Sequence, residues 1–248
     1  MRIHSSNEQV LDIPWSGLVG FYDPAIYRSF TNGSTTFVDL STNAANCTFT
    51  YAPTYDNTTG GLSLNFGTTN DNFGTVTNNT LGRIGNSAHT IITFYKNPAT
   101  PNGDDDLIST NLNASPNYGV ILLMTPYQTA GNVSTGYIRA HLWTSNGLYK
   151  VDSSQGILST SSWRMIAQRY NNSNILELIH NGSVIGTNTG VSGSKTTSNT
   201  KFFIGNRDGT QRADNISGNL GVILVYNRAL TDTEVTQIWT TYRKRYGI

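Results

Sequence analysis

The stretch "VYNRALTDTEVTQIW", from Val225 to Trp239, predicts one well-marked helix in a chain that otherwise reads as short strands. Thr231 suits the N-cap position, and Glu234 three residues later completes a capping box. Leu230 before the cap and Val235 at the fourth helical position suit a hydrophobic staple. These signals predict a helix that begins directly after Thr231 and runs toward the end of the 248-residue chain.

The expected helix carries a single apolar stripe. The residues at helical spacing are Val235, Ile238, Trp239, Tyr242 and Tyr246. A basic run at 243–245 falls in the last turn, where cations interact favourably with the helix dipole. Threonine is a weak helix former, and this helix contains several, so it needs a partner for its stripe. We therefore expect the aromatic residues of the stripe to pack rather than to bind a ligand.

Outside this helix, runs rich in Thr, Val, Ile, Tyr and Phe alternate with turns rich in Gly, Asn and Ser. Examples are "GLVGFYD" (17–23), "HTIITFYKN" (89–97), "SWRMIAQRYN" (162–171) and "NLGVILVYN" (219–227). Many short strands without alternating helices favour an all-β sandwich or barrel.

The strand patterns indicate which faces are covered. In "GYIRAHLW" (136–143), Tyr137, Arg139 and His141 fall on one face and apolar residues on the other, which predicts a strand exposed to water on one side. The runs "GVILLM" and "GVILVY" are apolar throughout, which predicts central strands covered on both faces.

The composition excludes several classes of protein. Charged residues are 12% of the chain and the net charge is +1, so no overall basic field exists to hold nucleic acid or an anionic membrane. A single cysteine, Cys47, rules out an intramolecular disulfide. The opening "MRIHSSNEQVLDIPW" lacks the apolar run of a signal peptide, and no apolar window is long enough to span a membrane.

Three segments together resemble a known family. They are "GFYDPAIYRSFTNGSTTFVDLSTNAAN" (20–46), "SSWRMIAQRYNNSNILELIHNGSVIG" (161–186) and "FFIGNRDGTQRADNISGNLGVILVYNRALTDTEVTQIWTTYRKRYGI" (202–248). The chain resembles concanavalin A-like (laminin-G-like, LamG-type) jelly-roll domains of the kind found in bacteriophage and other virion structural proteins. The resemblance implies an all-β, concanavalin A-like jelly-roll sandwich of two antiparallel sheets with one short C-terminal helix. We expect this domain over residues 17–248, after an N-terminal arm over residues 1–16.

The residues argue against an enzyme. Glycoside hydrolases need two carboxylates across the scissile bond, and the related enzymes place them as Glu, Asp and Glu on alternate positions of one strand. This chain has three glutamates, Glu8, Glu177 and Glu234, and they do not form that motif. A degenerate glycanase remains an alternative, since folding could bring two aspartates together.

Two kinds of binding site have candidates. Asp104, Asp105 and Asp106 form the one acidic run, which we place in a loop between two strands. Calcium prefers oxygen ligands, and related domains hold calcium at a sandwich edge, so this loop is the candidate metal site if calcium is bound. No cofactor is required by the sequence.

For a saccharide, the candidate residues are those of a strand-end turn and an aromatic platform. The turn "GNRDG" (205–209) contributes Asn206, Arg207 and Asp208, which suit a turn with a projecting arginine. The aromatic candidates beside glycines or turns are Tyr118, Tyr127, Trp143 and Tyr149, and Trp143 is the one we select.

Together these observations predict a non-enzymatic virion structural protein, such as a phage capsid decoration, fibre or tail-associated adhesion module. Its partners would be other virion proteins, its own copies in a homo-oligomer, and host-surface glycans. It would assemble in the host cytoplasm and reside in the virion, with the polar arm docking on the particle. The alternative is a free lectin-like carbohydrate-binding protein, with or without calcium.

Overall fold

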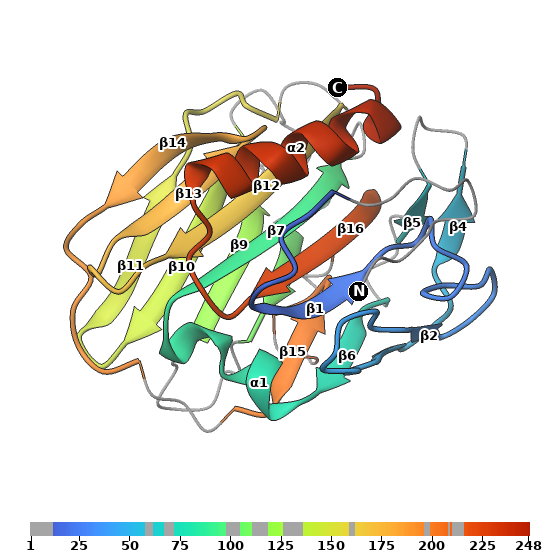
Figure 1. The fold of residues 1–248 in the computed structure, drawn as a ribbon, viewed down its shortest axis with the longest axis horizontal. Coiled ribbons are helices and arrows are strands. Elements are labelled where there is room, and N and C mark those ends of the chain that lie inside the picture. Colours follow the sequence, from blue (N-terminus) through green and yellow to red (C-terminus); the bar gives the residue numbers. More distant parts are fainter. Residues whose placement is uncertain are drawn as a thin grey trace.

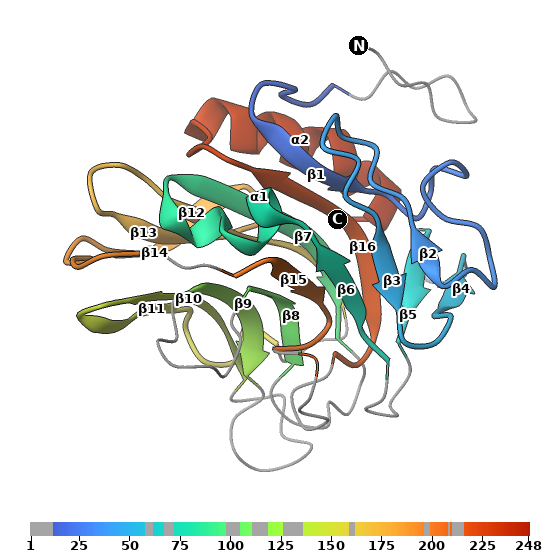
Figure 2. The same cartoon turned by 90° about the horizontal axis from the view of Figure 1, so that it is seen from below.

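The computed structural model describes most of the chain and places it in two stacked sheets with one long helix. The described residues are 12–57, 62–66, 72–97, 105–110, 119–125, 136–158, 162–195, 199–207, 209 and 216–248. Figure 1 shows the helix lying across one sheet, and Figure 2 shows three layers, namely the helix, a first sheet and a second sheet.

Sheet I is the layer next to the helix. Its strands follow the order β14-β13-β12-β7-β16-β5-β4, and β1 also pairs with β16. The bounds are β1 (Leu18–Tyr22), β4 (Thr54–Asp56), β5 (Ser63–Asn65), β7 (His89–Lys96), β12 (Trp163–Tyr170), β13 (Leu176–His180), β14 (Ser183–Asn188) and β16 (Asn219–Tyr226).

Sheet II forms the other side of the sandwich, with strand order β11-β10-β9-β8-β15-β6-β3-β2. The bounds are β2 (Thr36–Phe37), β3 (Cys47–Phe49), β6 (Gly74–Thr77), β8 (Asp105–Ser109), β9 (Gly119–Thr125), β10 (Tyr137–Thr144), β11 (Gly147–Asp152) and β15 (Lys201–Ile204). Between β6 and β7 lie the short helix α1 (Asn79–Gly82) and a 3₁₀ turn, η1 (Ile84–Asn86). The predicted fold class, two antiparallel sheets in a sandwich with a C-terminal helix, is confirmed.

The main core lies between the sheets and follows the strand alternation. On β10, Ile138, Ala140 and Leu142 are fully buried in this core, whereas Arg139 and Trp143 are partly exposed on the opposite face. Strand β16 is buried at every position, because one of its faces meets the core and the other meets the helix. Both patterns confirm the sequence predictions for these strands.

Helix α2 (Asp232–Tyr246) covers the outer face of sheet I and confirms the predicted helix and its cap. Thr231 is the N-cap, and the reciprocal hydrogen bonds of the capping box with Glu234 are both present. The Tyr246 ring lies 4.7 Å from Phe94 and 4.5 Å from Trp163, both on sheet I. This second cluster buries the stripe that the helix could not leave in water. No described helix is long and apolar enough to cross a membrane.

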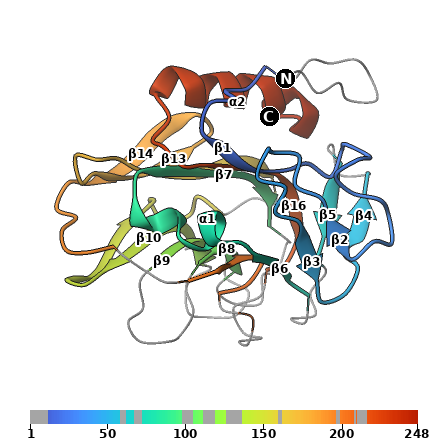
Figure 3. The ribbon, with the colours of Figure 1, turned by 60° about the horizontal axis from the view of Figure 1, so that its bottom comes forward.

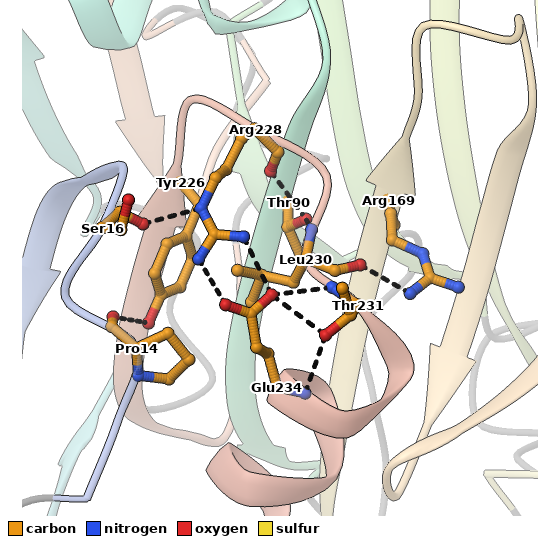
Figure 4. Close-up of polar contacts among 9 residues, drawn as sticks. All are labelled: Pro14, Ser16, Thr90, Arg169, Tyr226, Arg228, Leu230, Thr231 and Glu234. Atoms are coloured by element: carbon orange, nitrogen blue, oxygen red, sulfur yellow. Dashed lines mark hydrogen bonds and ion pairs between the residues drawn. The ribbon is translucent and has the colours of Figure 1, made fainter.

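The "YNRALT" turn fastens the start of α2 to sheet I (Figure 4). Arg228 binds both carboxylate oxygens of Glu234, at 2.8 and 2.6 Å. The hydroxyl of Thr90 on β7 donates to the carbonyl of Arg228 and accepts from the amide of Leu230. The hydrogen bond from Arg228 lowers the pKa of Glu234 to about 2, so this carboxylate is ionised at neutral pH. The described residues of the "YNRALT" turn and Glu234 therefore have a structural role, because they hold the start of α2 against sheet I.

The described ends of the chain lie on the helix side of the sandwich (Figure 3). Gln237 and Thr241 of α2 donate to the Asp12 side chain and carbonyl, each at 2.7 Å. Ile13 is buried in the same cluster, and Ile248 packs against it. Because of these contacts, residues 12–16 belong to the packed domain, whereas the sequence analysis assigned them to the N-terminal arm. Residues 1–11, the rest of that arm, lie outside the described part of the chain.

Gly221 tests how closely α2 approaches the sheet. A Cβ at Gly221 would lie 2.3 Å from the Tyr246 hydroxyl, which accepts a hydrogen bond from the Val222 amide. Because Tyr246 is wedged between aromatic rings, it cannot move without disturbing the cluster. We expect Gly221→Ala to lower the free energy of unfolding by about 2 kcal/mol, which is about 4–8 °C in Tm by calorimetry.

Gly190 offers the matched control. A Cβ there would meet no atom closer than the Asn188 side chain at 3.6 Å. Gly190→Ala should leave Tm nearly unchanged, and an equal loss in both variants would mean that Tyr246 does not set the spacing between helix and sheet.

Candidate functional site

The candidate site lies on the outer face of sheet II, because α2 occupies the outer face of sheet I. On β10 the residues of this face are Tyr137, Arg139, His141 and Trp143. The paired positions on β11 that share the face are Leu148, Lys150 and Asp152. Polar and aromatic side chains therefore gather along two neighbouring strands, opposite the helix.

A first ion pair joins β10 to β11. Both the Nε and Nη2 atoms of Arg139 bind the carboxylate of Asp152, with Nη2 at 2.8 Å from Oδ2. Nη2 also donates to the Tyr137 hydroxyl at 2.9 Å, and the guanidinium lies 4.9 Å from that ring. Burial opposes ionisation of Asp152, but the hydrogen bonds and the positive charge of Arg139, together with the charge of Lys150, outweigh it and lower the pKa of this carboxyl. Asp152 is thus a carboxylate that holds Arg139 in place.

A second ion pair lies on β8 and the turn after β15. Nε of Arg207 is 3.0 Å from Oδ2 of Asp106, whose side chain is completely buried. The Ser109 hydroxyl donates to the carbonyl of Arg207 at 2.8 Å, which fixes the backbone there. The guanidinium of Arg207 is therefore directed to a buried carboxylate 101 residues away in the sequence.

The predicted acidic loop is wrong for two of its three residues. Asp105 and Asp106 belong to strand β8, and Asp106 pairs along the sheet with Leu123 of β9. A guanidinium beside Asp106 is a poor neighbour for calcium, because it already compensates the negative charge. Asp104 lies outside the described residues. Among the described residues, no group of three or more His, Cys, Asp or Glu could hold a metal.

His141 is the unusual residue of this face. Its side chain is 6% exposed, yet neither ring nitrogen has a hydrogen-bond partner in the described part of the chain. Burial lowers the pKa of His141 to about 3, and the positive charges of Arg139 and Arg207 lower it further. The imidazole is therefore neutral at physiological pH. Buried polar atoms without partners are costly, and both nitrogens are closed to solvent here.

Trp143 lies beside this imidazole. The two ring centroids are 4.8 Å apart and the rings are nearly perpendicular, with Trp143 partly exposed. The arrangement gives a neutral hydrogen-bonding ring next to an aromatic surface, flanked by two arginine–carboxylate pairs. Groups of this kind suit a polar, uncharged ligand with an apolar face.

Two interior side chains support β10 beneath the site. Nε2 of Gln168, on β12 of sheet I, donates to the backbone carbonyl of His141 at 3.2 Å. The same nitrogen is 3.2 Å from Nε2 of His89, and Nδ1 of His89 is 2.9 Å from the Ser87 carbonyl. Both contacts are satisfied when His89 is neutral with its proton on Nδ1. The two sheets are therefore linked by a polar contact directly behind His141.

The other predicted ligand residues have different positions. Asn206 is buried, and its Oδ1 accepts from the Gly209 amide, so it closes the turn from which Arg207 projects. Asp208, Tyr118 and Tyr127 lie outside the described residues. Tyr149 packs against the core and contacts Ser192 at 2.8 Å. Of the predicted set, the structure brings Trp143 and Arg207 to the same face, together with Arg139, Asp152 and His141, which were not selected.

Comparison with known sequences identifies the family. The profile of the concanavalin A-like lectin/glucanases superfamily matches residues 67–236. The chain belongs to this superfamily. No curated protein sequence matches the chain significantly.

Several solved structures share the fold of this superfamily member. The binding domain of Paraclostridial Mosquitocidal Protein 1 matches with a TM-score of 0.66 and 17% identity, over 91% of this chain and 52% of that one. Trypanosoma rangeli sialidase matches with a TM-score of 0.63 and 16% identity, over 94% of this chain and 34% of that one. A third match is domain 4 of AbnA, a GH43 extracellular arabinanase from Geobacillus stearothermophilus, solved in complex with arabinotriose. Its TM-score is 0.62 and its identity 17%, over 90% of this chain and 98% of that one. This chain thus spans about half of the first and about a third of the second.

The buried histidines predict a particular dependence of stability on pH. Burial lowers the pKa of His89 to about 4 and that of His141 to about 3, against an ordinary value of 6.5. Below about pH 6.5 the unfolded chain binds protons at these residues and the folded chain does not, so acid favours unfolding. We expect each to remove about 1.4 kcal/mol of stability per pH unit from about pH 6.5 down to about pH 4.

Calorimetry between about pH 8 and pH 4.5 measures this effect. Tm should be flat above about pH 7 and fall below it, with a shallower fall in His89→Gln. A Tm that is constant across this range would mean that the histidines bind protons equally in the folded and the unfolded chain.

Proposed function

We propose that this chain is a non-catalytic saccharide-binding module whose ligand lies on the outer face of sheet II. The observation that carries the proposal is Trp143, a partly exposed indole that packs against the buried His141 ring on a face lined with polar side chains. The Arg139–Asp152 and Arg207–Asp106 pairs supply further fixed donors and acceptors around it. The fold is also that of a domain solved with arabinotriose and of the binding domain of a mosquitocidal protein.

The state of the carboxylates favours binding over catalysis. A glycosidase needs one carboxyl that stays protonated to act as the acid. On this face the lowered pKa of Asp152 keeps that group ionised, and Asp106 is paired with Arg207. Glu177 is bound to Arg169 at 2.6 Å on sheet I, and Glu234 caps α2. Each of these carboxylates therefore has a structural partner.

A glycan array of the full chain, repeated with Trp143→Ala, tests the proposal. We expect binding to a defined group of saccharides, and a loss of affinity of about tenfold or more when the indole is removed. Tyr27→Ala is the matched control, because Tyr27 is 76% exposed in the loop between β1 and β2. A chain that binds no saccharide, or that loses affinity equally in both variants, would contradict the proposal.

We further propose that the module serves attachment as part of a virion, together with other virion proteins and its own copies. The resemblance of the C-terminal segment to phage and virion domains supports this setting. Self-association has a suitable surface in β14, an uncharged strand at the edge of sheet I whose Val184 and Ile185 are 40% and 39% exposed. Edge strands without charges readily pair with another chain.

Light scattering after size-exclusion chromatography tests the assembly, with calcium and with a chelator. We expect an oligomer of the full chain whose mass and Tm do not respond to calcium, since Asp106 is already compensated by Arg207. A monomer that gains thermal stability with calcium would instead favour a free, calcium-dependent lectin.

A further inference from the structure

An asparagine followed by a glycine is a chemically reactive pair, and the described residues contain three of them. The pairs are Asn32–Gly33, Asn146–Gly147 and Asn181–Gly182. The backbone nitrogen of the glycine can attack Cγ of the asparagine, because glycine has no side chain to obstruct the approach. The attack needs an asparagine side chain that can rotate and a nitrogen that is free. The contacts of each pair therefore decide how reactive it is in the folded protein.

The pair Asn181–Gly182, in the turn between β13 and β14, is held on both sides. The Asn181 amide donates to the Met165 carbonyl, and Oδ1 of Asn181 accepts from the Met165 amide, both at 2.9 Å. A Cβ at Gly182 would lie 3.0 Å from two ring atoms of Trp239, so the glycine backbone packs directly against the indole. Turning the Asn181 side chain toward the Gly182 nitrogen would break one of these hydrogen bonds.

The pair Asn146–Gly147 joins β10 to β11, and its asparagine side chain is also held. Nδ2 of Asn146 donates to the Ser192 hydroxyl at 3.0 Å, and the Asn146 amide donates to the Thr144 hydroxyl at 3.1 Å. A Cβ at Gly193 would lie 2.9 Å from Cγ of Asn146, so the backbone of Gly193 covers the carbon that would be attacked. Exposure to solvent alone does not make this pair reactive.

The pair Asn32–Gly33 has none of these restraints. Both residues are exposed, in the loop between β1 and β2. The Thr31 carbonyl accepts from the Ser34 amide at 2.9 Å, and Gly33 has a φ of +82°, as the third residue of a type II turn requires. Across the part of the chain that the structure describes, neither the Asn32 side chain nor the Gly33 amide has a hydrogen-bond partner. A Cβ at Gly33 would meet no atom within 4 Å, so the turn is open to the reaction.

We propose that Asn32 is a site of spontaneous covalent modification, at which its carboxamide is hydrolysed through a cyclic imide. The Gly33 nitrogen loses its proton and bonds to Cγ of Asn32. The Cγ–Nδ2 bond breaks, and ammonia leaves with that proton. Water then opens the imide at either of its two carbonyls, which leaves an aspartate or an isoaspartate at position 32. Water is the one co-reactant, and no electron is gained or lost.

The modification would change the charge of the protein and leave its architecture in place. It replaces a neutral group by a carboxylate, so it takes the formal net charge of the chain from +1 to 0. A net charge of zero weakens the repulsion between molecules and favours association. Position 32 lies in the loop before β2, and β2 is at the opposite edge of sheet II from β11. The face proposed to bind saccharide is therefore unaltered, and the inference does not depend on that function.

The experiment is to incubate the full chain at about pH 8.5 and about 37 °C and to follow each pair by peptide mass spectrometry. Trypsin places Asn32, Asn146 and Asn181 in three different peptides, because arginines and lysines lie between them. We expect Asn32 in the folded chain to convert at least about tenfold faster than either of the other two. In guanidinium chloride, where the folded contacts are lost, the three rates should agree within about threefold. Equal rates in the folded chain, or faster conversion at Asn146 or Asn181, would overturn the inference.

Gly33→Ala tests whether the reaction passes through the backbone nitrogen. The added methyl group obstructs the attack and should slow conversion of Asn32 about tenfold or more. Gly190→Ala is the matched control in another exposed loop and should leave the rate unchanged. A rate that is the same in Gly33→Ala as in the unaltered chain would overturn the inference.

Asn32→Gln gives a second measurement that does not alter the glycine of the turn. The longer side chain cannot form the same ring with the Gly33 nitrogen, so the acidic form that accumulates in ion-exchange chromatography should disappear. Because position 32 is exposed, Tm should stay within about 2 °C of the unaltered chain. An acidic form that accumulates at the same rate in Asn32→Gln would show that the modification lies elsewhere and would overturn the inference.

Discussion

The packing of α2 on sheet I is the constraint on which the rest of the structure depends. A two-layer sandwich has two outer faces. An outer face that is apolar must be buried against another element rather than left in water. Here Phe94 and Trp163 make the outer face of sheet I apolar, and the aromatic stripe of α2 covers it. The Arg228–Glu234 pair and the capping box fix where the helix starts. Sheet II can therefore carry polar side chains on its outer face.

The features that could be predicted from the sequence are those set by local chemistry. The helix has its cap, its staple and its stripe between Leu230 and Tyr246, so its start could be located to the residue. The alternation on β10 gave the correct two faces. The acidic run was misplaced because its surroundings are non-local. Asp106 is buried in a strand by its pairing with β9 and by Arg207, which is 101 residues away. Three adjacent carboxylates alone look like a solvated loop.

The candidate site was only partly predictable for the same reason. Trp143 and Arg207 could be selected by residue type and by their position next to turns. His141 was placed on the correct face, but an imidazole in a strand gave no sign that it would be buried without partners. That property arises from tertiary packing, including the contact from Gln168 that holds the β10 backbone. A pairing pattern could have indicated the Arg139–Asp152 ion pair only once the register of β10 and β11 was known.

The positions of Asp12 and Ile248 decide how the domain would present the face proposed to bind saccharide. Asp12 and Ile248 both lie on the α2 side of the sandwich, and the outer face of sheet II is on the far side. A body held next to Asp12 or Ile248 would therefore sit behind the domain and leave sheet II pointing outward. In an array of such domains every copy would offer its face in the same direction, so weak individual contacts could add up through multivalency.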